Sequence, residues 1–202
     1  MKPITFVFFC WSQLIFAGPH MIHAEVTKVK GKVYLNTHPL KKGIKIERGG
    51  EITTKDKSFV KIYSPTTHST ITIGPNSSMS FKWDKAVKKN HQLMQSLYTL
   101  QKGFCRWVSK GKPKGDGPKI LTKTAVMGVR GTDFYASYNP LLEETEIAMF
   151  DGIVEFKSAT GNQKKVITQG MWGGLGGRYG EKMKTLNITP QVLKFFKDAT
   201  YF

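Results

Sequence analysis

The residue types that could carry out chemistry are few in this sequence, and their spacing does not favour catalysis. After residue 24, no pair of histidines has a spacing typical of metal ligands and there is one cysteine, so a zinc site would need an unusual ligand set. The serines stand in turn-like segments with no histidine placed near them by the sequence. We therefore expect no enzymatic activity, no cofactor and no metal ion. The histidines that follow residue 24 are His38, His68 and His91.

One acidic cluster is dense enough to suggest a glycosidase-type pair of carboxylates. Glu143, Glu144 and Glu146 fall within four positions. On a strand with alternating faces they are better interpreted as the polar edge of a sheet. The cluster predicts a surface feature and no hydrolytic site.

The stretch most unlike the rest of the chain is Thr124-Ala-Val-Met-Gly-Val-Arg-Gly-Thr-Asp-Phe134, in which one arginine stands among small and apolar residues. Arg130 has the same parity as Phe134, so on a regular strand both would point into the core. A buried guanidinium needs a carboxylate partner, and Glu146 or Glu155 on the following strand could supply one. The alternative is an arginine that presents its planar fork to an anionic ligand. The motif residues are Gly128, Val129, Arg130, Gly131, Thr132, Asp133 and Phe134.

The elements that would position this motif are short strands. Apolar and polar residues alternate over 25–35, 58–63 and 145–148, and glycine, proline, asparagine and serine recur between such segments. This pattern predicts an all-β domain built as a β-roll, a sandwich or a β-helix-like array. We expect a loop at 84–90 and a strand pair over 93–108 that reverses near Lys102 and Gly103.

The C-terminal segment has a different period. Thr189 can cap a helix and Pro190 suits its first position, and the apolar residues that follow share one helical face. We expect a signal peptide at 1–24, a β domain at 25–186 and an amphipathic helix within 187–202 that docks on it. The residues of the apolar face are Val192, Phe195, Phe196 and Ala199.

The stretch Ala125-Val-Met-Gly-Val-Arg-Gly-Thr-Asp-Phe134 resembles the core motif of FecR-type domains. Further similarities are Gly31-Lys-Val33, Gly50-Glu-Ile-Thr-Thr54, Lys102-Gly-Phe104 and Asp151-Gly-Ile-Val154, so the resemblance covers about residues 26–170. It implies an extracytoplasmic β-rich domain used for interaction, and the apparent signal peptide of this chain indicates a stand-alone, exported form. Known members couple an outer-membrane receptor to a cytoplasmic sigma factor through a cytoplasmic segment and a membrane helix. This chain instead begins with an apparent signal peptide, so direct sigma-factor regulation is not what the sequence predicts.

The first 24 residues have the layout of a secretory signal peptide. Lys2 is followed by an apolar run of about 14 residues, which is shorter than the roughly 20 needed to span a bilayer. Cleavage after Ala24 would leave Cys105 as the lone cysteine, which we expect to be buried as a small apolar residue. We expect a periplasmic or secreted protein with no membrane span after cleavage.

Charge is distributed unevenly along the chain, whose formal net charge is +17. Residues 26–115 hold 19 Lys and Arg against 4 Asp and Glu, whereas residues 116–202 hold 11 against 9. A basic surface outside the cytoplasm favours an anionic envelope polymer or an acidic protein over nucleic acid. The leading hypothesis is an envelope module that binds such a partner, and the alternative is a signalling component of a FecR-like sensing system. The proposed surface comprises Lys28, Lys30, Lys32, Lys41, Lys42, Lys85, Lys88, Lys89, Lys110, Lys112 and Lys114.

Overall fold

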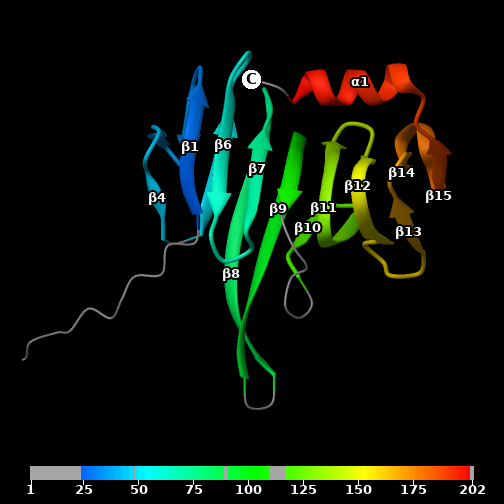
Figure 1. Ribbon diagram of the computed structural model, residues 1–202, viewed down its shortest axis with the longest axis horizontal. Coiled ribbons are helices and arrows are strands. Elements are labelled where there is room, and N and C mark those ends of the chain that lie inside the picture. Colours follow the sequence, from blue (N-terminus) through cyan, green and yellow to red (C-terminus); the bar gives the residue numbers. More distant parts are fainter. Residues whose placement is uncertain (1–23, 48, 89–90, 110–116, 201–202) are drawn as a thin grey trace, which may run out of the picture.

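The computed structural model describes residues 24–47, 49–88, 91–109 and 117–200, and it is almost entirely β-structure (Figure 1). The strands are β1 (Ala24–Lys30), β2 (Val33–Leu35), β3 (His38–Pro39), β4 (Lys45–Ile46), β5 (Gly50–Thr54), β6 (Phe59–Ser64), β7 (Ser69–Ile73), β8 (Ser78–Lys88), β9 (His91–Ser109), β10 (Lys119–Leu121), β11 (Ala125–Asn139), β12 (Glu144–Ser158), β13 (Lys164–Thr168), β14 (Met171–Gly176) and β15 (Gly180–Asn187). A short 3-10 turn η1 (Gly177–Tyr179) and one α-helix, α1 (Pro190–Ala199), complete the described chain. The predicted all-β class with a short C-terminal helix is confirmed.

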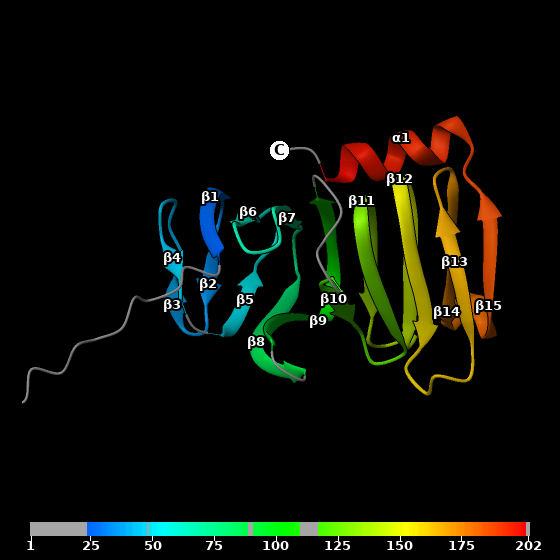
Figure 2. The same ribbon diagram turned by 60° about the horizontal axis from the view of Figure 1, so that its bottom comes forward.

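All fifteen strands belong to one sheet, which folds over on itself around a single main core. One half contains β4, β1, β6 and β7, and the other contains β3, β2, β5 and β8. Figure 2 shows β2 and β5 below β1 and β6, and side chains of both halves join the same buried cluster. Alternation along each strand makes this possible, because one face is apolar and meets the opposite half.

Three long strands, β9, β11 and β12, take part in both halves of the sheet, because each pairs with different neighbours near its beginning and near its end. The first part of β9 pairs with β8 and β10, and its last part pairs with β7 and β11. In the same way, β12 pairs with β14 near its beginning and with β13 near its end. The expected loop at 84–90 is therefore wrong up to Lys88, and Lys102 and Gly103 do not reverse the chain but lie within unbroken β9. Gly103 suggested a turn from the sequence alone. In the structure, β9 continues through it, because pairing with β8 before it and with β11 after it keeps the chain extended.

A bulge interrupts the pairing of β11 with β12 inside the motif. The register shifts between Arg130 and Asp133, where Gly131 has a φ of +56°. Opposite it, Gly152 has a φ of +80°, and a Cβ at this position would lie 2.3 Å from the carbonyl oxygen of Gly131. Main-core residues of β11 fall on odd numbers up to Val129 and on even numbers from Phe134 onward, and Tyr135 is buried on the opposite face in the second cluster. The extra residue thus exchanges the inward and outward faces of the strand.

Helix α1 docks on a second apolar cluster, separate from the main core. Thr189 accepts a hydrogen bond from the amide of Val192 at 3.4 Å, and Pro190 occupies the first turn, as the sequence indicated. Phe196 is 3% exposed and packs with aromatic residues of β11 and β12. Figure 1 shows α1 lying across the upper ends of these strands. Phe195 is 67% exposed, so its expected place on the buried face is wrong. Leu193 contributes to the docked face instead.

Candidate interaction site

The motif residues lie on β11 on both sides of the bulge. Val129 and Phe134 are buried in the main core, and Thr132 is 2% exposed. The side chain of Arg130, by contrast, is exposed. The interpretation of Arg130 as a buried link between strands is therefore wrong. The prediction failed because β11 has a bulge at Gly131. The bulge interrupts the regular alternation of inward and outward side chains, so Arg130 and Phe134 do not point to the same face.

The two expected partners of Arg130 pair with other cations. Glu146 accepts hydrogen bonds from the Arg178 guanidinium and from the Tyr179 hydroxyl, the latter at 2.6 Å. Glu155 forms ion pairs with Lys157 at 2.6 Å and Lys164 at 2.5 Å. Hydrogen bonds from these lysines lower the pKa of the Glu155 carboxyl to about 2. The assignment of either glutamate to Arg130 is wrong.

The motif does contain an ion pair, made by its acidic residue. Asp133 accepts two hydrogen bonds from Arg106 of β9, from Nε at 2.8 Å and from Nη2 at 2.7 Å. The Arg106 guanidinium also lies 5.1 Å from the Phe150 ring, and its Nη1 donates to the Thr200 hydroxyl at 3.4 Å. The pair therefore ties the motif strand to the residue that ends α1. Sequence reasoning missed Arg106, because only the β9–β11 register places it opposite Tyr135, two positions beyond Asp133 along the strand.

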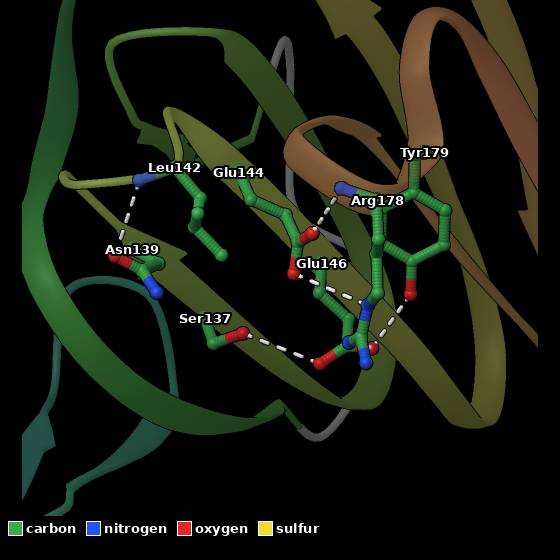
Figure 3. A network of polar contacts seen from close by, with 7 residues as sticks. All are labelled: Ser137, Asn139, Leu142, Glu144, Glu146, Arg178 and Tyr179. Carbon is green, nitrogen blue, oxygen red and sulfur yellow. Dashed lines mark hydrogen bonds and ion pairs between the residues drawn. The ribbon is translucent and has the colours of Figure 1, made fainter.

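A second polar network lies on β12 and η1 (Figure 3). Glu144 accepts a hydrogen bond from the Arg178 amide at 2.8 Å and pairs with Arg178 Nε at 3.2 Å. Glu144 and Glu146 are only 8% and 6% exposed, so their interpretation as a polar sheet edge is wrong. Burial raises the pKa of the Glu146 carboxyl despite its hydrogen bond from Tyr179 and the charge of Arg178. Both carboxylates are engaged by Arg178, which holds the turn at η1 against β12.

A concave pocket of about 760 Å³ lies next to this network, between the turns at one end of the molecule. Its wall includes Leu142 and Leu175 together with the exposed ion pair of Lys123 and Glu143. Among the described residues, no group of three or more His, Cys, Asp or Glu side chains is placed to hold a metal ion. The wall also carries further polar and charged side chains, among them Asn162, Glu181 and Lys182, so the pocket is of mixed character.

The basic residues predicted to form one surface are only partly placed by the structure. Lys28, Lys30 and Lys32 are exposed on or just after β1, and Lys41 and Lys42 are exposed on the turn before β4. The Lys30 ammonium lies 5.9 Å from the Phe59 ring. The side chains of Lys85 and Lys88, and all of Lys89, Lys110, Lys112 and Lys114, lie outside the described residues. The described part of the surface is thus a group of five lysines at the β4 end of the sheet.

The fold and the site define an all-β domain whose motif maintains strand pairing and the docking of a C-terminal helix. The family model for the FecR protein matches residues 50–155, which is more than half of the 202-residue chain. The chain belongs to the FecR family, as the motif resemblance predicted. Membership supports a regulatory or signalling role linked to envelope sensing and protein interaction.

Two crystal structures with a similar fold are of a candidate anti-sigma factor from Parabacteroides distasonis ATCC 8503. One superposes with a TM-score of 0.58 over 72% of this chain and 63% of that chain, and the other with 0.55 over 71% and 62%. Sequence identity is 12% in both cases, so the similarity is one of fold. The matched region spans less than two thirds of either of those chains. No curated protein matches this chain.

Proposed function

We propose that this protein is a non-enzymatic regulatory component of an envelope sensing system and that it acts by binding another protein. The observation that carries the proposal is the FecR family match over residues 50–155. The fold similarity to a candidate anti-sigma factor is consistent with a regulatory scaffold. The described polar networks have a structural role, because Asp133, Glu144 and Glu146 each hold elements of the fold together.

The proposed location is the periplasm or the outside of the cell, reached through a cleaved signal peptide. The predicted signal peptide falls mostly within 1–23, outside the described residues. Ala24, after which cleavage is predicted, is the first residue of β1 and is 1% exposed. No helix in the described part of the chain is both long and apolar enough to span a membrane. Sequencing the N-terminus of the protein from an envelope fraction tests the export proposal.

Recovery of the protein with its partner tests the signalling proposal directly. We expect the full chain to co-purify from native envelopes with a receptor even at about 1 M salt, where the Debye length is about 3 Å. Deletion of the gene should also abolish a transcriptional response to the ligand of that receptor. Loss of co-purification at high salt together with an unchanged response in the deletion strain would contradict the proposal.

A second candidate function is binding to an anionic envelope polymer or an acidic protein through the basic surface. The observation that favours it is the group of exposed lysines at the β4 end, Lys28, Lys30, Lys32, Lys41 and Lys42. Retention on isolated cell wall or anionic vesicles should then fall steeply with added salt, since exposed charges are screened. Charge reversal at Lys28 and Lys30 should lower retention at low salt. Retention that changes neither with added salt nor with these substitutions would rule this function out.

A further inference from the structure

The folded sheet has two outward faces that differ in how they are covered. On the half that contains the end of β11 and the start of β12, α1 covers the outward aromatic residues Tyr135 and Phe150. On the other half, formed by β10, the start of β11, the end of β12 and β13, the outward side chains are not covered by α1. Ile153 and Val166 there are 48% and 53% exposed, although both are apolar. We call this second surface the motif face.

The register places the exposed motif arginine on this face. Arg130 pairs with Ile153 across β11 and β12, and Glu155 on β12 pairs with Val166 on β13. These residues are therefore close neighbours on the same side of the sheet. Lys119 of β10 pairs with Gly128 on the other flank. The motif face thus combines two exposed aliphatic side chains with basic residues from adjacent strands.

The charges of the motif face are not balanced within the described chain. Glu155, which lies between Ile153 and Lys157 on this face, is already paired with Lys157 and Lys164. Among the described residues, no hydrogen-bond or ion-pair partner of the Arg130 guanidinium is present. A guanidinium without a partner, beside exposed aliphatic side chains, is complementary to a carboxylate carried by an apolar partner segment.

Gly128 gives an independent reason to regard this face as a contact surface. Unlike Gly131 and Gly152, it has no positive φ, and a Cβ there would meet only Glu155, at 3.7 Å and farther. The fold itself therefore tolerates a side chain at this position. A glycine inside a strand weakens it and often marks a bulge, a tight bend or a place where a ligand or another backbone approaches closely.

We propose that the motif face is the docking surface for an acidic protein segment that also carries apolar side chains. This proposal rests on the proposed function, because it assigns the site at which the partner is bound. Arg130 receives a carboxylate of the partner, Ile153 and Val166 contact its apolar side chains, and Gly128 leaves room for its backbone. The family motif then serves the fold through Gly131 and Asp133 and serves binding through Gly128 and Arg130.

Site-specific photocrosslinking in the native envelope tests the proposal. A benzophenone amino acid is placed at Ile153 in one full-length variant and at Leu186 of β15, 52% exposed and equally apolar, in a control. We expect a protein adduct from position 153 that is absent from position 186. Mass spectrometry should map the adduct to a partner peptide containing Asp or Glu next to apolar residues.

Substitutions then establish whether Arg130 and Gly128 are responsible. Arg130→Glu should lower the adduct yield more than about tenfold, since like charges across an interface cost several kcal/mol. Reversal of the partner's acid to Lys should restore the yield. Gly128→Val should lower the yield while leaving the melting temperature unchanged or raised, because β-branched residues favour strands. Lys184→Glu, an exposed position on β15, is the matched control and should have no effect.

Other outcomes overturn the docking assignment. An adduct that persists with Arg130→Glu, an adduct formed with a second copy of this chain, or one formed with lipid or polysaccharide would each do so. If the receptor still co-purifies at high salt while position 153 forms no adduct, the docking surface is wrong and the proposed function stands. If neither is observed, both fail.

Discussion

At the scale of single residues, the facing glycines at the bulge are positions where the backbone leaves little room for a side chain. Gly152 has a φ of +80°, and any Cβ there would lie 2.3 Å from the carbonyl oxygen of Gly131. A left-handed conformation costs a residue with a Cβ about 1–2 kcal/mol, and the contact adds to this cost. Gly152 therefore sets the register that turns Arg130 outward.

Gly152→Ala should lower the free energy of unfolding by about 2–4 kcal/mol, measured by chemical denaturation. Gly161→Ala is the matched control, because Gly161 also has a positive φ, +75°, but has no atom within 4 Å of its Cβ position. It should cost only about 1 kcal/mol. Equal losses at the two positions would show that the contact with Gly131 is unimportant.

The two charged residues of the motif should differ in their effect on stability. Asp133→Ala removes the partner of Arg106 in a pair whose side chains are only 22% and 23% exposed, and should cost about 1–3 kcal/mol. Arg130→Ala removes an exposed side chain and should change the free energy of unfolding by less than about 0.5 kcal/mol. Thermal denaturation of both variants is the measurement. A larger loss for Arg130→Ala than for Asp133→Ala would contradict the geometry.

At the scale of elements, α1 depends on a small number of contacts. Phe196 is its one buried apolar side chain, in contact with Tyr135 at 4.7 Å and Trp172 at 6.0 Å between ring centroids. The hydrogen bond from Arg106 to Thr200 anchors the end of the helix to the pair with Asp133. The helix is therefore coupled to the motif through both apolar packing and a polar link.

Phe196→Ala should release α1 from the sheet, since truncating a buried phenylalanine costs about 3–5 kcal/mol in a well-packed core. Amide hydrogen exchange within residues 190–199 should then accelerate, while exchange in β7 and β9 remains slow. Phe195→Ala, at the neighbouring 67% exposed position, is the control and should leave exchange unchanged. Unchanged protection of α1 in the Phe196 variant would show that other contacts hold it.

At the scale of the whole molecule, one core joins both halves of the sheet. Strands β9, β11 and β12 contribute side chains to it on both sides of their bends, so neither half has a core of its own. Cys105 lies inside this core with no exposed surface, and burial raises the pKa of its thiol to about 12. Its chemistry should therefore report on the unfolding of the entire domain.

Alkylation of Cys105 should be undetectable in the native state and should become fast only in denaturant, because the thiolate and access to it both require unfolding. Peptide mapping after timed exposure to iodoacetamide follows this residue separately from Cys10. The extent of labelling should follow the loss of native circular dichroism across a urea titration. Rapid labelling without denaturant would indicate local opening around β9.

The sequence by itself determined the all-β class, the FecR family, the burial of Cys105 and the start of the C-terminal helix. These features depend on local information, namely strand alternation, capping residues and a contiguous motif. The export signal, the basic surface as a binding site and the absence of enzymatic activity stay predictions.

The tertiary structure alone decided which way Arg130 points and which cations meet Glu146 and Glu155. The inward and outward residues of a strand can be predicted from alternate positions only if the strand is regular. The bulge at Gly131, opposite Gly152, interrupts this alternation in β11. Arg178 of η1 and Arg106 of β9 reach their acids from elements distant in sequence, and no local pattern encodes the pairing that brings them together. The motif therefore identified the family from the sequence, but only the tertiary structure showed which of its residues point outward.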